Sequence, residues 1–212
     1  MAKQRIFKHL CMISLLAGIT LCLNACSSIS AATAPKVPAK AVNNACQIFE
    51  QNPNWYWEAL QTYNRWGVPV SVQMAIIKHE SDFQAGAKTQ HKKFLGIPTW
   101  SHVTSAYGYA QVVNGTWKQY QQETQNYQCS RDKFGDASDF IGWYANKANQ
   151  QYGIRLNDAY NLYLAYHEGL AGYGKQTYLQ KPWLIQLAKQ VQAQANSYRK
   201  QIKKCKYSIP TH

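Results

Sequence analysis

Apolar stretches with helical periodicity, separated by proline, glycine and capping residues, limit the fold of this chain more than any other feature. Asn52-Pro53 offers an N-cap and a first-turn proline, which predicts a helix over 55–66. Pro69 opens a second helix, which should end near Glu80-Ser81. Four further helices are expected over Asn114–Gln125, Asp136–Tyr152, Asn157–His167 and Pro182–Lys204, with Asp136 and Asn157 as N-caps.

Residues 84–106 interrupt this series with Gly86, Gly96 and Pro98 in a stretch of mixed polarity. A loop of this length in a compact domain is usually functional, and a short hairpin within it is possible. No convincing alternation of apolar and polar residues indicates a larger sheet. The sequence therefore predicts a single all-α domain.

The N-terminus predicts secretion. Residues 1–10 are basic without an acid, and an apolar run over 11–23 follows, as in a signal peptide. Leu23-Asn24-Ala25-Cys26 resembles a bacterial lipobox, which implies a signal peptide over 1–25 and lipidation of Cys26. An ordinary signal peptide and an uncleaved anchor are the alternatives. By analogy with enterobacterial sorting, Ser27 favours a periplasmic protein anchored to the outer membrane.

The next segment, 26–45, is small, polar and free of aromatic residues, so we expect a flexible tether. The folded domain is then expected over 46–212, a normal size for one domain. This division leaves one catalytic or binding domain downstream of the tether.

The charge bounds the partners of this domain. The chain carries 23 Lys and Arg against 10 Asp and Glu, a net charge of +13. Outside the cytoplasm nucleic acid is not an expected partner, whereas peptidoglycan carboxylates and anionic lipid headgroups are. Plain solubility is the alternative explanation.

Cysteine positions predict one disulfide. Once the signal peptide and a lipidated Cys26 are set aside, Cys46, Cys129 and Cys205 remain in an oxidising compartment. Cys46 and Cys205 bracket the domain and are the preferred pair, and so long a loop could contribute about 4–5 kcal/mol. No Cys-x-x-Cys spacing supports a thiol metal site, and no cofactor is expected.

Glu80 is the first candidate for chemistry. It ends an apolar helix, where the partial negative charge of the helix terminus disfavours a carboxylate. Apolar neighbours would favour the protonated form further. A glutamic acid protonated near neutral pH is what a glycosidase general acid requires. A surface glutamate at a helix end is the simpler alternative.

The second motif is Ser105-Ala106-Tyr107-Gly108-Tyr109-Ala110-Gln111. Its glycine would let the backbone approach a ligand closely, and Gln111 can both donate to and accept from an acetamido group. A turn leading into the next helix explains the same residues without a ligand.

The third motif is Ala165-Tyr166-His167-Glu168-Gly169, a helix end with an aromatic hydroxyl and a glycine stop. Taken alone, it is equally consistent with a core tyrosine followed by a C-terminal capping glycine.

In this order and spacing the three motifs resemble the soluble lytic transglycosylase family, which is related in fold to goose-type lysozyme. The family pairs Glu-Ser with Gly-Leu-Met-Gln and then Ala-Tyr-Asn-(Ala)-Gly. Tyr109-Ala110 departs from the family's Leu-Met, His167 replaces its asparagine, and Glu168 adds a carboxylate. The resemblance spans about residues 55–183 and implies a divergent member with a lysozyme-like helical fold.

The resemblance also implies a mechanism. Glu80 would protonate the oxygen between N-acetylmuramic acid (MurNAc) and N-acetylglucosamine (GlcNAc), then accept the C6 hydroxyl proton as a 1,6-anhydro product closes. Glycan contacts are expected from Ser81, Tyr107, Gly108, Gln111, Tyr166 and His167. No metal is required, because His79-Glu80 and His167-Glu168 lack a His-Glu-x-x-His spacing.

Two other functions remain open at this point. A lysozyme-type muramidase would use water, with Asp82 or Glu168 as the second carboxylate. A catalytically silent peptidoglycan-binding lipoprotein would retain the cleft without the chemistry. Peptidoglycan glycan strands are the expected partner in each case.

Overall fold

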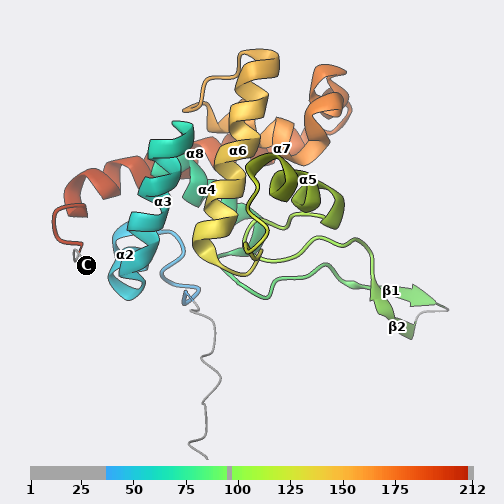
Figure 1. Cartoon of the computed structure of the whole chain (residues 1–212), viewed down its shortest axis with the longest axis horizontal. Coiled ribbons are helices and arrows are strands. Elements are labelled where there is room, and N and C mark those ends of the chain that lie inside the picture. The colour runs from blue at the N-terminus through green and yellow to red at the C-terminus, as the bar shows by residue number, and fades with distance from the viewer. Residues whose placement is uncertain (1–36, 95–96, 210–212) are drawn as a thin grey trace, which may run out of the picture. The chain divides into compact units, whose positions relative to one another are not determined.

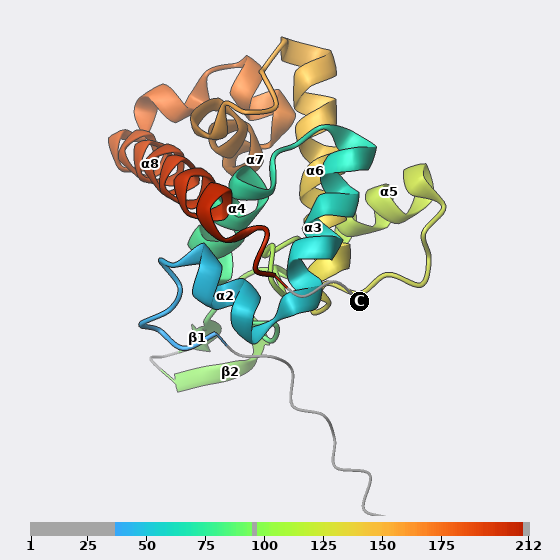
Figure 2. The same cartoon turned by 90° about the vertical axis from the view of Figure 1, so that its left-hand side faces the viewer.

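The computed structural model describes residues 37–94 and 97–209, and for residues 91–94 and 97–102 it describes only the backbone. Figures 1 and 2 show the arrangement of its elements. The helices are α2 (Ala45–Gln51), α3 (Pro53–Trp66), α4 (Val70–Ser81), α5 (Asn114–Thr124), α6 (Phe134–Tyr152), α7 (Ala159–Gly174) and α8 (Pro182–Cys205), with a 3-10 turn, η1 (Thr177–Gln180). The predicted all-α fold is confirmed.

Helix α4 lies at the centre of the core. It packs against α3, α6, α7 and α8, and residues 71–77 are all buried. The amide of Gln73 is satisfied inside the core, because it donates to the carbonyl oxygens of Ala59 and Val68 at 3.1 and 2.7 Å. A helix buried on every side can hold its last turn rigidly, and that turn carries Glu80.

Most helix boundaries agree with the sequence, but two predicted N-caps are wrong. Helix α6 begins one turn earlier, after Lys133, and Asp136 lies in its first turn, where its carboxylate accepts from the Ser130 N–H at 2.8 Å. The N-cap of α7 is Asp158, not Asn157, and it accepts from the Asn161 N–H. Helix α7 also continues to Gly174 across a kink at Gly169.

The expected hairpin is present in the loop between α4 and α5. Strand β1 (His91–Phe94) pairs antiparallel with β2 (Ile97–His102), with an irregularity between His91 and Lys93. Among the described elements, neither strand contacts a helix. The hairpin is therefore an arm of the loop and not a layer of the core.

The tether expected through residue 45 is wrong for residues 37–45. Val37, Ala41 and Val42 are buried, and the Val42 carbonyl oxygen accepts a hydrogen bond from the Tyr198 hydroxyl. Few apolar residues suffice here because α8 supplies the other side of the contact. The folded part thus begins before Cys46.

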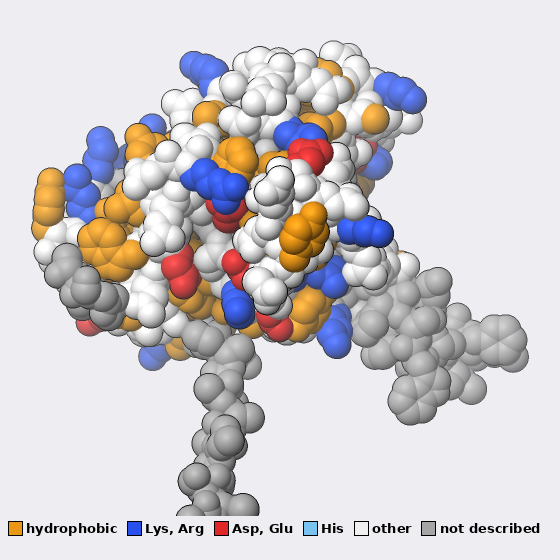
Figure 3. Space-filling model, viewed as in Figure 1, with side chains coloured by type: hydrophobic (Ala, Val, Ile, Leu, Met, Phe, Trp, Pro, Cys, Tyr) orange, Lys and Arg blue, Asp and Glu red, His pale blue; other side chains and the backbone are white. Residues whose placement is uncertain are grey.

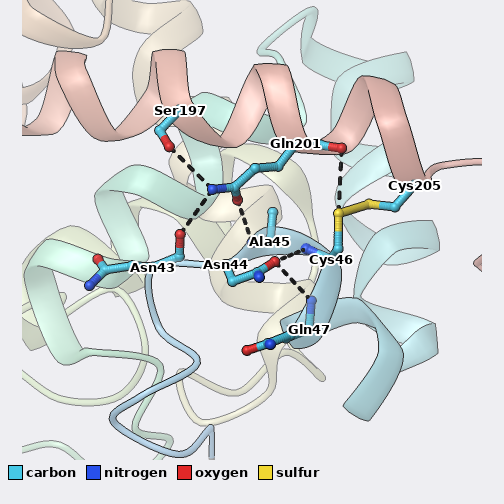
Figure 4. The surroundings of a disulfide bond; sticks show 8 residues. All are labelled: Asn43, Asn44, Ala45, Cys46, Gln47, Ser197, Gln201 and Cys205. Carbon is cyan, nitrogen blue, oxygen red and sulfur yellow. Dashed lines mark hydrogen bonds between the residues drawn. A yellow bond between two sulfur atoms is a disulfide. The ribbon is translucent and has the colours of Figure 1, made fainter.

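Cys46 and Cys205 form a disulfide, as predicted, with their Cα atoms 5.9 Å apart (Figure 4). Gln201 reinforces the junction, since its side chain accepts from the Ala45 N–H at 2.7 Å and donates to the Asn43 carbonyl at 3.1 Å. Within the described part, Cys129 is the free cysteine. Residues 37–45, which we call the entry segment, are therefore held against the C-terminal half of α8.

The predicted signal peptide (1–25), Cys26 and residues 27–36 lie outside the described residues. Across residues 37–94 and 97–209, no helix is both long enough and apolar enough to cross a bilayer.

Candidate active site

A cleft of about 430 Å³ lies between the end of α4, the start of α5 and the middle of α7. Four of the predicted site residues line it: Glu80, Gln111, Tyr166 and His167. Ser81, Tyr107 and Gly108 do not. The other lining residues are Thr104, Ala106, Val112, Val113, Thr116, Phe140, Tyr144, Glu168 and Gly169.

Glu80 presents its carboxyl to this cleft from the last turn of α4. The chain turns away immediately afterwards, because Asp82 and Phe83 both have positive φ, at 48° and 60°. Burial raises the pKa of Glu80 to about 7. None of the ion pairs among the described residues involves Glu80, so no cation opposes this shift. The carboxyl is therefore substantially protonated at neutral pH.

Tyr163 is a site residue that the sequence analysis missed. It is buried on α7, and a hydrogen bond with Glu80 lowers the Glu80 pKa, against the larger effect of burial. Its signal in the sequence is its position three residues before Tyr166, which places both hydroxyls on one face of α7. Tyr163 orients the carboxyl and moderates its pKa.

The wall beside Glu80 is built from backbone. The Ser81 hydroxyl lies 2.8 Å from the Tyr109 carbonyl oxygen and joins the end of α4 to this wall. Gly108 has φ of 81°, and a Cβ atom there would lie 2.0 Å from the Arg131 carbonyl oxygen. Both residues were expected to meet the glycan. Both residues position the wall, and the backbone of Arg131 approaches closely at Gly108. Their contact with the glycan stays a prediction.

Neither residue of the departure Tyr109-Ala110 lines the cleft. Tyr109 points into the core, with its ring 5.4 Å from Trp55 and 5.9 Å from Phe134, and Ala110 is also buried. Gln111 faces the cleft, and its amide donates to the carbonyl oxygens of Ala87 and Gly108 at 2.9 and 2.8 Å. These bonds fix the direction of its amide group.

Tyr107 lies outside the cleft. Its hydroxyl donates to Asp132 at 3.0 Å, and its ring is approached by Lys88 and Arg131 at 5.5 and 5.3 Å. This network holds the 104–112 segment against the loop before α6. Tyr107 therefore supports this segment, and its contact with the glycan stays a prediction.

Tyr166 spans the cleft from α7. Its hydroxyl donates to the Ala110 carbonyl oxygen at 2.6 Å, and its ring packs at 5.3 Å from that of Tyr144. Burial and the nearby Glu80 charge raise the pKa of Tyr166, so its hydroxyl keeps its proton. The tyrosine thus fixes the distance between the wall and the helix that faces it.

His167 and Glu168 occupy the end of the cleft where α7 is kinked. Glu168 accepts a hydrogen bond from Lys181 Nζ at 2.7 Å and another from Thr177, which lower its pKa to about 2. His167 Nδ1 lies 3.2 Å from Glu168, and its ring meets Trp183 edge to face at 5.2 Å. Glu168 is therefore ionised and held by its neighbours, and it orients His167.

In the described part of the chain, no three His, Cys, Asp or Glu side chains lie close enough together to hold a metal ion. The polar groups available to a substrate in the cleft are a protonated carboxyl, an oriented amide, tyrosine hydroxyls and an imidazole. This set can donate a proton to a leaving oxygen and hold amide and hydroxyl groups of a sugar.

Comparison with known proteins agrees with this geometry. The family model described as the transglycosylase SLT domain matches residues 14–205, which is most of the chain. No curated protein and no solved structure matches. The chain therefore belongs to the transglycosylase SLT domain family and is a peptidoglycan lytic transglycosylase.

Proposed function

We propose that this enzyme cleaves the MurNAc–GlcNAc bond of peptidoglycan and leaves 1,6-anhydro-MurNAc ends, with Glu80 acting first as acid and then as base. The observation that carries the proposal is the Glu80 carboxyl, which faces the cleft with its pKa raised to about 7 by burial. General acids work best when their pKa lies near the working pH.

The reaction uses one carboxyl twice. Glu80 gives its proton to the glycosidic oxygen as the bond to C1 breaks, and the acetamido group of MurNAc stabilises the positive charge at C1. The Glu80 carboxylate then takes the proton of the C6 hydroxyl as that oxygen bonds to C1. Glu80 ends protonated, ready for another cycle, and no water is consumed.

Three side chains are proposed to hold the glycan. Gln111 would meet an acetamido group, while Tyr166 and His167 would line the subsite next to the cleaved bond. All three face the cleft, and their orientations are fixed by hydrogen bonds to the Ala87 carbonyl, the Ala110 carbonyl and Glu168, respectively.

A lysozyme-type muramidase is the second candidate, because Glu168 is an ionised carboxylate lining the same cleft as Glu80. Its hydrogen bonds to Lys181, Thr177 and His167 disfavour a role as nucleophile or base. A catalytically silent wall-binding protein is disfavoured by the raised pKa of Glu80, which binding alone does not need.

Mass spectrometry of digested sacculi distinguishes these functions. Digestion in H₂¹⁸O should give anhydro-MurNAc ends without ¹⁸O. Reducing MurNAc ends labelled with ¹⁸O would establish the muramidase instead. Binding to sacculi with no soluble fragments, from a protein whose folding is verified by circular dichroism, would establish the silent binder.

We also propose that the enzyme is a periplasmic lipoprotein, anchored through Cys26 with the outer membrane favoured. The proposal is supported by the lipobox-like Leu23-Asn24-Ala25-Cys26. Wild-type protein should carry labelled palmitate and fractionate with outer membrane, and Cys26→Ser should lose the label. Label that persists in Cys26→Ser contradicts this anchor.

A further inference from the structure

Charge is unevenly distributed along the chain. All ten acidic residues lie between Glu50 and Glu168, so 1–49 and 169–212 contain none. The second of these acid-free stretches carries eight cations: Lys175, Lys181, Lys189, Arg199, Lys200, Lys203, Lys204 and Lys206. The disulfide between Cys46 and Cys205 joins the two acid-free stretches in space.

Five of these cations form a patch at the C-terminal end of α8, which we call the basic end: Arg199, Lys200, Lys203, Lys204 and Lys206. The first four side chains are exposed, and none of the five takes part in an ion pair within the described residues. Figure 3 shows Lys and Arg side chains gathered where α8 ends.

An exposed aromatic ring accompanies these cations. Tyr207 is 85% exposed, and Lys206 Nζ lies 4.6 Å from its ring centre. Tyrosine rings with an apolar body and a polar tip are suited to the interface between lipid headgroups and acyl chains. Lysines near an anionic bilayer surface each contribute to attraction over about one Debye length.

The acidic groups near this surface do not neutralise it. Asp82 lies close enough to Tyr198 to influence its pKa electrostatically, but it is paired with Lys78 at 3.6 Å. Glu50 lies on α2, which packs against α8, but it forms no ion pair within the described residues. These are two acidic residues against five cations. The five cations of the basic end therefore retain an excess of positive charge.

The basic end is also where the chain enters the fold. Val42 and Asn43 are hydrogen-bonded to Tyr198 and Gln201 of α8, and the disulfide follows directly. The opposite end of α8 lies at the cleft, where Trp183 contacts His167. Because α8 has 24 residues, its two ends are about 36 Å apart.

We infer that the basic end docks on anionic phospholipid headgroups, so that α8 holds the cleft away from the bilayer. This inference goes beyond the reaction and uses the proposed lipid anchor only for the source of the membrane. The docking itself rests on the clustered charge, the exposed tyrosine and the position of the entry segment.

Vesicle co-flotation tests the docking, with every protein carrying Cys26→Ser so that no acyl chain anchors it. Vesicles of phosphatidylethanolamine and phosphatidylglycerol are compared with neutral phosphatidylcholine vesicles, which measure binding by the apolar N-terminal residues. The test variant neutralises Lys200, Lys203 and Lys204 with glutamine. The control neutralises Lys118, Lys175 and Lys189, which are exposed outside the basic end and give the same change of net charge.

We expect the test variant to lose affinity for anionic vesicles by on the order of a hundredfold, and the control to lose less than about threefold. Raising NaCl to 1 M, where the Debye length is about 3 Å, should abolish the difference. Equal losses of vesicle affinity in both variants would mean that the net charge of the whole protein, and not the basic end, causes the attraction. That result would overturn the inference.

Sacculus binding separates the lipid surface from the wall. If the test variant keeps its vesicle affinity but binds sacculi more weakly, the basic end binds carboxylates of the cell wall and the inference is wrong. Cleavage of soluble glycan strands should be unchanged in both variants. If the unmutated protein does not cleave glycan strands, the proposed reaction is contradicted, but the docking inference is not affected.

Discussion

Glu80 and Glu168 line the same cleft, yet their surroundings give them opposite protonation states. Glu80 ends a buried helix without an ion-pair partner among the described residues, and its pKa rises to about 7. Glu168 is also poorly exposed, but Lys181 and Thr177 donate to it and its pKa falls to about 2. Burial with a single tyrosine hydrogen bond and no cation makes Glu80 an acid, whereas hydrogen bonds from a lysine and a threonine make Glu168 a fixed anion.

The largest effect is expected from replacing Glu80, the protonated member of the pair. Glu80→Gln removes the proton while keeping the side-chain volume, so release of soluble fragments from sacculi should fall by about a thousandfold. Glu168→Gln is the matched control and should stay within about tenfold of wild type. Similar losses in the two variants would mean that the carboxyls act as a pair.

The second prediction concerns stability at alkaline pH. The folded pKa of Glu80 exceeds its unfolded value, so its contribution to stability is complete below about pH 4 and is lost as pH rises through 7. Glu80→Gln should raise the free energy of unfolding by about 2 kcal/mol at pH 8, a value reduced because the residue is only half-buried, and change it little at pH 4. Urea unfolding measures both. Equal stability of the two proteins at pH 8 would contradict the raised pKa.

The third prediction has the opposite pH dependence. The Glu168 pKa is depressed, so its contribution to stability is present above about pH 4.5 and is lost as pH falls through 2. Glu168→Gln should lower the free energy of unfolding by about 1 kcal/mol at pH 7, because Lys181 is partly exposed and can be hydrated. Thermal unfolding at pH 7 and pH 2 checks this, and a loss that is constant with pH would contradict it.

The smallest effect is expected from replacing Tyr163, which is hydrogen-bonded to Glu80. Its hydrogen bond lowers the Glu80 pKa, so Tyr163→Phe should move the descending limb of the pH–activity profile upward by less than about one unit. Tyr173→Phe is the control, since Tyr173 on the same helix bonds Asn161. A downward shift in Tyr163→Phe would reverse the assigned role.

Local sequence signals predicted the helices well and the entry segment poorly. Pro53, Gly67 and Pro182 mark helix ends through their own backbone preferences, which need no distant partner. Residues 37–45 have too few apolar side chains to indicate a fold, and their burial depends on α8, more than 150 residues away. Periodicity within one segment cannot report such a contact.

The candidate active site also has features that local sequence signals predict and features that depend on distant contacts. Glu80, Gln111, Tyr166 and His167 face one cleft, in agreement with the motif order. The sequence does not reveal that Ser81 and Gly108 lie against the carbonyl groups of Tyr109 and Arg131. Side-chain type predicted which groups could react, but not which ones the backbone already occupied.

The contact between Gly108 and Arg131 limits how the specificity of the cleft can be changed. A side chain at 108 would collide with main-chain atoms that cannot move aside, so this part of the wall is closed to redesign. Thr104, Ala106 and Thr116 line the cleft and already carry side chains. A library aimed at new glycan substrates should vary these three positions and keep residue 108 as glycine.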